Sequence, residues 1–177
     1  TTSSLYDALA ESLHLSPPAP AVPDALEREL EKRRGAHILL VEDSALNREM
    51  TCQLLESVGM RMSTAENGRI AADMVRRNVY DLILMDVQMP VMDGLQATEE
   101  IRRIPDRASV PILAMTANAF EEDRRVCLRA GMNDYVSKPI SPRLFVETLR
   151  RWLPSGADAL EDTPGLKGTV GESCSAS

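Results

Sequence analysis

Three short runs of continuous apolar residues constrain the fold more than any other feature of this chain. They are residues 37–41 (HILLV), 82–85 (LILM) and 111–115 (PILAM). A strand with one face in water alternates apolar and polar residues, whereas a strand buried on both faces is apolar throughout. We therefore expect these runs to be inner strands of a parallel sheet that is covered on both sides.

Segments of helical periodicity lie between the apolar runs. The first of them has an apolar residue at every fourth position, at Leu46, Met50, Leu54 and Val58, before Gly59 offers a natural helix end. Similar patterns predict further helices around residues 70–75, 95–101, 126–128 and 142–152, and weaker strands at 61–65 and 134–136. Five strands that alternate with five helices predict an α/β fold, a doubly wound five-stranded parallel sheet.

Composition divides the chain into three zones. Residues 36–153 contain the periodic segments, and we expect them to form the folded domain. We expect residues 1–35 to be a linker with a proline-rich stretch at 16–23, so that its deletion leaves the domain's stability nearly unchanged. Residues 154–177 are rich in Gly, Ser, Asp and Thr, which predicts a disordered tail or another linker.

Charge and cysteine content exclude several classes of protein. The net charge is −7 at pH 7, which argues against a nucleic-acid binder. No apolar run approaches the roughly 20 residues that cross a bilayer, and no signal peptide pattern opens the chain, so we expect no membrane contact by this segment. Cys52, Cys127 and Cys174 form no metal or disulfide pattern, which fits a reducing, cytoplasmic compartment.

Polar residues follow the expected strands at the points where those strands end. Glu42 and Asp43 follow the first strand, Asp86 the third, Thr116 the fourth and Lys138 the fifth. In doubly wound sheets ligands bind beyond the carboxyl ends of the strands, so we expect these side chains to meet. Three carboxylates together need a cation, and an oxygen-only ligand set suits Mg²⁺. A metal-bound carboxylate can attack phosphorus, while an ammonium and a hydroxyl bind phosphoryl oxygens.

Lys138 is also distinguished by composition. Residues 36–153 contain 14 arginines and one lysine, Lys138. Lysine presents a compact point charge and arginine a planar fork, so the two are not interchangeable beside a phosphate. The single lysine in an arginine-rich domain therefore indicates a specific role for an ammonium at this position.

These residues resemble the receiver domains of two-component response regulators and hybrid histidine kinases. The stretches that carry the resemblance are VEDSALNREM at 41–50, LILMDVQMPVMDG at 82–94, MTANAF at 115–120 and YVSKPI at 135–140. The resemblance covers about residues 36–153 and is greatest to receivers attached to hybrid sensor kinases. It implies a flavodoxin-like sheet with strand order 2-1-3-4-5.

The resemblance also implies a role for each site residue. Asp86 would take a phosphoryl group from a phosphohistidine and relay or release it, with Thr116 and Tyr135 as switch residues. The Mg²⁺ site it implies consists of Glu42, Asp43, Asp86 and Gln88. The implied partners are a histidine kinase core, a histidine phosphotransfer domain, or both. The chain starts at Thr1 rather than Met, so we expect a fragment of a longer hybrid kinase, which leaves a membrane anchor elsewhere in the parent chain open.

Other functions compete with this interpretation. A Mg²⁺-dependent phosphohydrolase with an aspartyl intermediate would carry a second acid two residues after the nucleophile, where this chain has Gln88. A pseudo-receiver that only binds partners would lack the acceptor, the acid pair or the lysine. A free-standing response regulator has the same site, so the sequence of the domain leaves that setting open.

The first fifteen residues allow two interpretations. Leu5, Tyr6 and Leu9 follow small or capping residues, much as Leu144 and Phe145 do in the last helix expected for the domain. Residues 1–15 could therefore be the final helix of a preceding receiver-like domain, with residues 16–35 as a connector. An ordinary amphipathic linker helix explains the same pattern.

Overall fold

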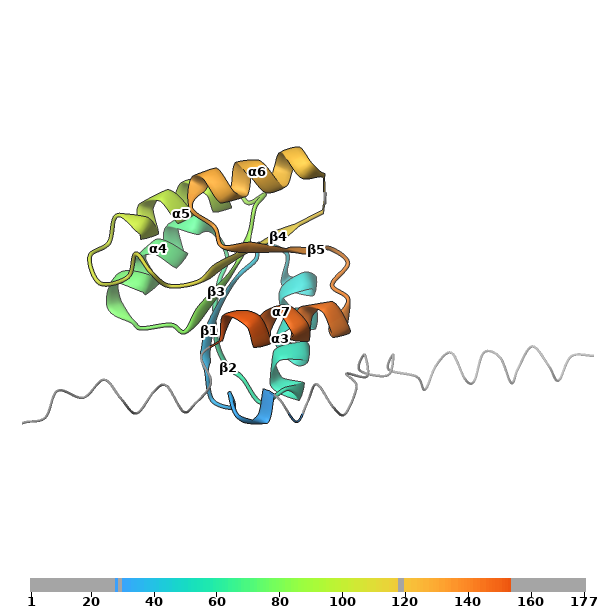
Figure 1. Cartoon of the computed structure of the whole chain (residues 1–177). Coiled ribbons are helices and arrows are strands. Elements are labelled where there is room, and N and C mark those ends of the chain that lie inside the picture. Colours follow the sequence, from blue (N-terminus) through green and yellow to red (C-terminus); the bar gives the residue numbers. More distant parts are fainter. Residues whose placement is uncertain (1–27, 29, 118–119, 154–177) are drawn as a thin grey trace, which may run out of the picture.

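Five parallel strands form one sheet in the order β2-β1-β3-β4-β5 (Figure 1). The strands are β1 (His37–Val41), β2 (Arg61–Ala65), β3 (Leu82–Asp86), β4 (Ile112–Thr116) and β5 (Asp134–Ser137). The computed structural model describes residues 28, 30–117 and 120–153. The predicted flavodoxin-like sheet is confirmed, whereas the predictions for residues 1–15, 16–23 and 154–177 lie outside the described residues.

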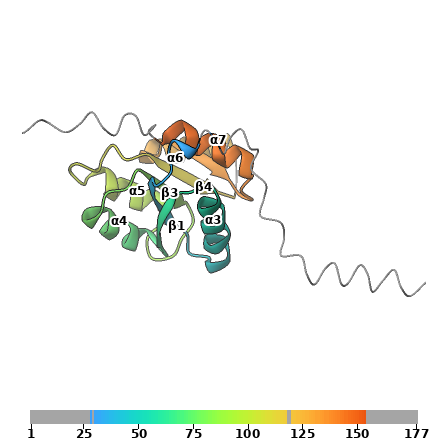
Figure 2. The same ribbon diagram turned by 90° about the horizontal axis from the view of Figure 1, so that it is seen from below.

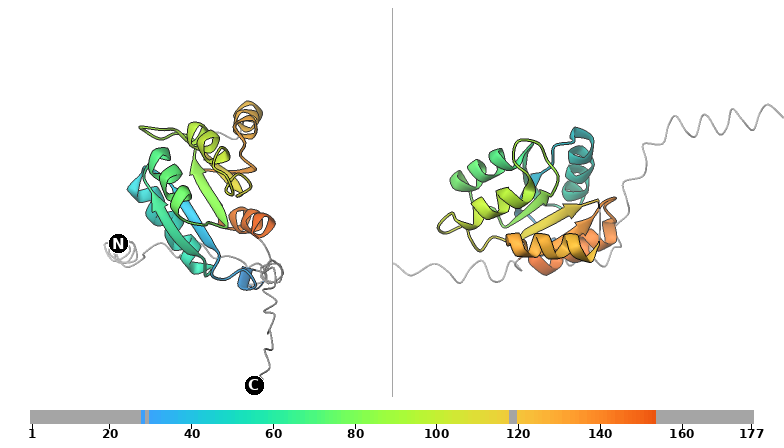
Figure 3. Two further views of the ribbon diagram at one scale, coloured as in Figure 1. Left: turned by 90° about the vertical axis from the view of Figure 1, so that its left-hand side faces the viewer. Right: turned by 90° about the horizontal axis from the view of Figure 1, so that it is seen from above.

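Helices cover both faces of this sheet (Figures 2 and 3). One face carries α3 (Ala45–Ser57) and α7 (Pro142–Trp152), and the other carries α4 (Gly68–Arg77), α5 (Gly94–Arg102) and α6 (Glu121–Ala130). None of the helices in the described ranges has both the length and the apolar character that a bilayer crossing requires.

The inner strands are buried on both faces, as their continuous apolar runs predict. In β1, Ile38 and Leu40 pack with the core beneath α3 and α7, while Leu39 and Val41 pack with the core beneath α4, α5 and α6. All four side chains have 0% exposure. Successive side chains of a strand point to opposite faces, so one short strand contributes to both cores.

The apolar stripe of α3 is only partly buried. Leu54 and Val58 are 5% exposed, but Leu46 is 70% and Met50 62% exposed. A residue advances about 100° around an α-helix, so a four-residue repeat drifts by about 40° at each step. The stripe therefore begins in solvent and turns into the core, which leaves two large apolar side chains uncovered beside the carboxyl end of β1.

The folded unit extends upstream of the boundary expected at residue 36. Leu30 has 0% exposure and belongs to the same apolar core as Leu149 and Leu153. Arg33 Nε donates a hydrogen bond to the Leu153 carbonyl at 3.0 Å. The proline-rich stretch and high charge of this region suggested a linker, but residues 30–35 close the end of the sheet at which the strands begin. Residues 30–35 thus contact the core of the domain, and we propose a domain boundary at or before Leu30 in place of the one expected at residue 36.

All five carboxyl ends of the strands meet at the opposite edge of the sheet. Neighbouring strands are parallel and nearly in register, with Val41 opposite Met85, Asp86 opposite Met115 and Thr116 opposite Ser137. Residues that end different strands are thereby placed side by side, although the chain separates them widely. This edge holds the polar residues that the sequence analysis selected.

Candidate functional site

Three carboxylates converge at the carboxyl ends of β1 and β3. Glu42 and Asp43 directly follow β1, and Asp86 is the last residue of β3. One carboxylate oxygen from each lies within 4.8 Å of the others. Glu42 is 1% and Asp86 5% exposed, whereas Asp43 is exposed. The predicted cluster is therefore present, with two buried acids and one acid open to solvent.

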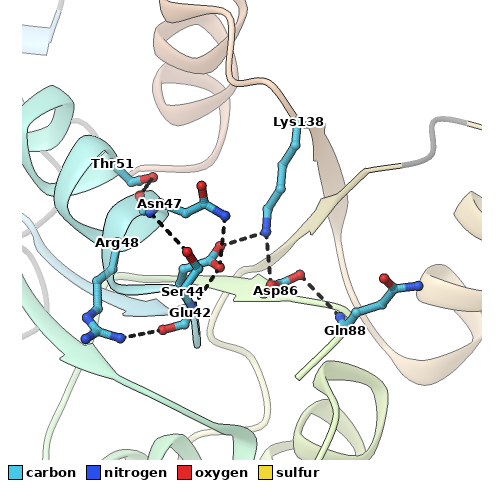
Figure 4. Close-up of polar contacts among 8 residues, drawn as sticks. All are labelled: Glu42, Ser44, Asn47, Arg48, Thr51, Asp86, Gln88 and Lys138. Atoms are coloured by element: carbon cyan, nitrogen blue, oxygen red, sulfur yellow. Dashed lines mark hydrogen bonds and ion pairs between the residues drawn. The ribbon is translucent and has the colours of Figure 1, made fainter. Parts of the chain in front are cut away.

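Lys138 forms ion pairs with both buried acids (Figure 4). Its Nζ lies 2.7 Å from Glu42 Oε2 and 2.9 Å from Asp86 Oδ2. Its backbone N–H donates to the Thr116 carbonyl at 2.8 Å, which holds residue 138 beside the end of β4. Burial alone would lower the pKa of Lys138, but the hydrogen bonds and charges of Glu42 and Asp86 outweigh it and raise that pKa. The ammonium therefore stays charged at neutral pH.

The carboxylate of Asp86 is held at both oxygens. Oδ2 faces Lys138, and Oδ1 accepts a hydrogen bond from the backbone N–H of Gln88 at 3.2 Å. Burial raises the pKa of Asp86 above its ordinary value, and the bonds to Lys138 only partly offset that effect. The folded protein thus holds a carboxyl group that is short of solvation, and the ionised form of that group is favoured by a nearby cation or electrophile.

Gly94 allows α5 to begin directly against the end of β3. Asp93 caps this helix, its Oδ1 accepting from the backbone N–H of Gln96 at 2.8 Å. A Cβ on Gly94 would overlap the backbone carbonyl oxygen of Asp86. The backbone N–H of Gly94 also donates to the Val87 carbonyl at 3.1 Å. A glycine is therefore required here by close approach, and it fixes the backbone that carries Asp86.

The acids line a cavity of about 240 Å³. Its polar wall includes Gln88, Thr116 and Lys138 together with the three acids, and its apolar wall includes Leu95 of α5 and Val126 and Cys127 of α6. A cavity of this kind can admit a phosphoryl-sized group to the buried carboxylate while covering one side of it with apolar atoms.

Tyr135 lies outside this cavity. It sits opposite Ala114 in the β4–β5 pairing and is half-buried, and the guanidinium of Arg124 on α6 lies 5.4 Å from the centre of its ring. Thr116, by contrast, is among the lining residues. The structure thus brings together all the residues predicted for the acid site and places the predicted aromatic switch residue behind it, against α6.

Three contacts to Glu42 come from residues to which the sequence analysis gave no role. The backbone N–H of Ser44 and the side-chain amide of Asn47 both donate to Glu42 Oε1, at 3.3 and 3.4 Å. Arg48 Nη1 donates to the Glu42 backbone carbonyl at 2.8 Å. Their position in the sequence is the signal that could have identified them, because these residues form the first turn of the helix that directly follows the acid pair.

The donor set fits a hard divalent cation. All three clustered ligand groups are carboxylates, and Gln88 and Thr116 also line the cavity. Oxygen-only sites of low ligand number suit Mg²⁺, which retains several waters. One ammonium against three carboxylates leaves a net charge of −2 for this group of four side chains, so a divalent cation would neutralise it. Sulfur and imidazole ligands do not take part in this cluster, although Cys127 reaches the cavity wall.

Residues 38–150 match the family model of the response regulator receiver domain. This range covers more than half of the chain, and it contains the sheet, the acids and the lysine described above. The chain therefore belongs to the receiver domain family of two-component signalling.

The relatives with the matched domain include sensor kinases. The chain is 41% identical over 122 residues to the sensor protein GacS of Pseudomonas syringae, a match that covers 67% of this chain and 14% of GacS. It is 34% identical over 141 residues to the histidine kinase BarA of Escherichia coli, covering 79% of this chain and 15% of BarA. The chain thus spans about a seventh of the length of these relatives.

Solved structures agree with the sequence matches. The receiver domain of the sensor histidine kinase PA1611 from Pseudomonas aeruginosa, solved with a magnesium ion coordinated in its active-site cleft, is 45% identical with a TM-score of 0.63, covering 67% of this chain and 97% of that one. The receiver domain of Saccharomyces cerevisiae Ssk1, crystallised with the histidine phosphotransfer protein Ypd1, is 29% identical with a TM-score of 0.64, covering 73% of this chain and 94% of that one.

Proposed function

We propose that this domain takes a phosphoryl group from a phosphohistidine onto Asp86 and then relays or releases it within a phosphorelay. The observation that supports the proposal best is the position of Asp86, a buried carboxylate paired with Lys138 and clustered with Glu42 and Asp43. A structural role alone does not account for three acids and a lysine in one cavity. The sensor kinase relatives support a hybrid histidine kinase as the parent chain. We propose that the domain acts in the cytoplasm.

The transfer exchanges one bond to phosphorus for another. An Asp86 carboxylate oxygen attacks the phosphorus of the donor, the bond between phosphorus and the imidazole nitrogen breaks, and the released imidazole takes up a proton. Lys138, already 2.9 Å from Asp86 Oδ2, is placed to bind a transferring phosphoryl oxygen. Thr116 lines the same cavity and would donate its hydroxyl to another of those oxygens.

Glu42, Asp43 and Asp86, with Gln88 at the cavity wall, would hold a Mg²⁺ ion. When bound, the ion supplies positive charge that offsets repulsion between the acids and the incoming phosphoryl group. The magnesium ion in the PA1611 receiver supports the same assignment for this chain. Removal of divalent cations should therefore abolish acceptance of a phosphoryl group.

A small phosphodonor tests the acceptor without a partner protein. We expect acetyl phosphate with Mg²⁺ to add one phosphoryl group to the wild-type chain, and none after Asp86→Asn or with excess EDTA, as measured by intact-protein mass spectrometry. Equal incorporation in the wild type and in Asp86→Asn would reject Asp86. Rapid net hydrolysis of phosphomonoesters would instead favour a phosphohydrolase, although Gln88 supplies no second acid and Figure 4 draws its side chain extending away from Asp86.

Replacement of Lys138 by arginine tests whether phosphorylation requires a lysine at this position. The substitution keeps the positive charge, but a planar fork cannot reproduce a single Nζ placed 2.7 Å and 2.9 Å from two different carboxylates. We expect phosphorylation by acetyl phosphate to slow by at least about ten-fold. Arg129→Lys, an exposed change on α6, is the matched control. A wild-type rate in Lys138→Arg would remove Lys138 from the mechanism.

The exposed end of α3 is the proposed docking surface for a histidine phosphotransfer domain. Leu46 and Met50 are exposed apolar residues on the helix that follows the acid pair, and Pro139 is exposed directly after Lys138. A partner helix that brings a histidine to Asp86 would cover both sides of the cavity. The Ssk1 receiver in complex with Ypd1 shows that a related domain meets such a partner.

Phosphotransfer kinetics separate docking from chemistry. We expect Leu46→Ala to slow transfer from a phosphorylated histidine phosphotransfer domain by about five- to ten-fold, the effect of losing a moderate interface anchor, while phosphorylation by acetyl phosphate stays near wild type. Val79→Ala is the matched control, because Val79 is 64% exposed in the turn that leads into β3 at the other edge of the sheet. Equal slowing by both substitutions would place the partner elsewhere.

A further inference from the structure

Glu42 is the most constrained member of the acid cluster. Its backbone N–H donates to the Ala65 carbonyl at 3.0 Å, which continues the β1–β2 pairing beyond the strand. Its Oε2 faces Lys138, and its Oε1 accepts from Ser44 and Asn47. Asp43, next in the chain, is exposed and has no hydrogen bond or ion pair recorded within the described ranges. The two adjacent acids are thus held very differently.

The donors on Glu42 Oε1 are electrically neutral. A backbone N–H and a side-chain amide orient a carboxylate without cancelling its charge, whereas a second ammonium would neutralise it. Lys138 is the charged donor on Glu42, and phosphorylation of Asp86 adds new anionic oxygens that compete for the same Nζ. The Ser44 N–H and the Asn47 amide are the donors in Figure 4 that can stay on Glu42 when Lys138 is shared with a phosphoryl group.

Arg48 secures the main chain of the same residue. Its Nη1 lies 2.8 Å from the Glu42 carbonyl oxygen, and its Nη2 lies 3.4 Å from Glu66 Oε1, just beyond β2. The Arg48 side chain is 19% and the Glu66 side chain 69% exposed. An exposed ion pair contributes little, so the partly buried contact to the carbonyl is the stronger of the two. The positive charge of Arg48 therefore meets the Glu42 backbone and does not pair with the Glu42 carboxylate.

We propose that Asn47 and Arg48 are positioning residues for metal binding, which orient Glu42 through its carboxylate and its carbonyl without neutralising it. The inference rests on the proposed function, because it assumes that the acid cluster holds Mg²⁺. Asn47 keeps the carboxylate aimed into the cavity, and Arg48 fixes the backbone from which both acids project. The first turn of α3 thereby completes a site whose other elements are strand ends.

A magnesium titration followed by amide chemical shifts tests Asn47. Asn47→Leu keeps the size of the side chain and removes its donor, and we expect the Kd for Mg²⁺ to rise by about three-fold while the metal-free melting temperature stays within about 2 °C of wild type. Asn47→Lys should weaken Mg²⁺ binding further, because it neutralises Glu42. Gln53→Leu is the matched control, since Gln53 is an exposed amide that donates to Glu49 on the same helix.

Each outcome of this titration is decisive. Unchanged Mg²⁺ affinity in Asn47→Leu with normal binding by the wild type would overturn the role of Asn47 and leave the proposed function intact. Absence of Mg²⁺ binding by the wild type would reject the proposed function itself. If Asn47→Leu lowered the free energy of unfolding of the metal-free protein by as much as it lowered the free energy of Mg²⁺ binding, Asn47 would have an ordinary structural role.

The two contacts of Arg48 can be separated in the same assay. Glu66→Gln removes the exposed ion pair and keeps the bond to the Glu42 carbonyl, so we expect Mg²⁺ affinity within two-fold of wild type. Arg48→Lys keeps the charge but loses the guanidinium that contacts the Glu42 carbonyl and Glu66 at the same time. We expect the Kd for Mg²⁺ to rise by about three-fold. Equal effects from both substitutions would show that the link to Glu66, and not the carbonyl contact, matters.

Discussion

The two edges of the sheet are closed in opposite ways. At the carboxyl edge the buried groups are charged, with Glu42 1% and Asp86 5% exposed beside Lys138. At the amino edge they are apolar, with Leu30 at 0% and Leu153 at 3% exposed. Burial of charged groups costs free energy even when they are paired, whereas burial of leucine contributes it. The comparison indicates that one edge carries the chemistry and the other supplies stability.

The amino edge is closed by the segment that leads into β1. The Gly35 N–H donates to the Gly59 carbonyl at 3.0 Å, and the Arg61 N–H donates to the Ala36 carbonyl at 2.9 Å. With the bond from Arg33 to Leu153, these contacts join the segment to the residues that follow α3 and α7 and to the start of β2. Residues 30–36 are therefore part of the domain, and their contribution can be separated from that of the site.

Leu30→Ala should have the largest effect on stability and leave the site intact. Truncation of a fully buried leucine typically costs about 2–5 kcal/mol, and Leu30 has 0% exposure. We expect chemical denaturation to show a loss in this range, with the Kd for Mg²⁺ unchanged. Leu46→Ala, the same change at a residue 70% exposed, is the control and should cost less than about 0.5 kcal/mol. Equal stabilities of the two variants would contradict the anchoring role of Leu30.

Gly94→Ala should lower both the stability of the domain and its rate of phosphorylation. The added Cβ would overlap the Asp86 carbonyl, so α5 or the end of β3 must shift, at a cost of about 1–3 kcal/mol. We expect lower stability together with slower phosphorylation by acetyl phosphate. A variant that loses stability but keeps the wild-type rate would show that the carboxyl edge tolerates displacement, which would weaken the division between the two edges.

Asp86→Asn should change the stability least of the three substitutions, and it should raise the stability where the other two lower it. Burial raises the pKa of Asp86, so the ionised carboxylate destabilises the metal-free fold at pH 7. We expect the metal-free variant to melt about 2–5 °C above wild type, and the difference to disappear as the pH falls below about 3.9, where Asp86 becomes protonated in the folded and unfolded states alike. Addition of Mg²⁺ should stabilise the wild type alone. A lower melting point for metal-free Asp86→Asn would show that the ion pair with Lys138 outweighs burial.

The carboxyl edge was predictable from the sequence because parallel strands bring their ends together. Continuous apolar runs identified β1, β3 and β4, and the residue after each run then identified the acids and Thr116. The amino edge was not predictable in this way. The burial of Leu30 depends on contacts with Leu149 and Leu153, more than a hundred residues away, and the charged, proline-rich surroundings of Leu30 indicate a linker.

Contacts within the site were also harder to predict than its members. Asn47 and Arg48 reach Glu42 because α3 starts immediately after the acid pair, a geometry that periodicity does not reveal. Exposure of Leu46 follows from the drift of a four-residue repeat around the helix, and the same stripe is buried at Leu54. Side-chain direction in the first turn therefore required the structure.

Chemical mapping of the phosphoryl group tests the central claim most directly. An aspartyl phosphate is an acyl phosphate, which borohydride reduces to homoserine, so peptide mass spectrometry after reaction with acetyl phosphate and Mg²⁺ reports the modified position. The account predicts homoserine at position 86, lost in Asp86→Asn and when EDTA replaces Mg²⁺. Homoserine at position 43, or undiminished modification without Mg²⁺, would contradict it.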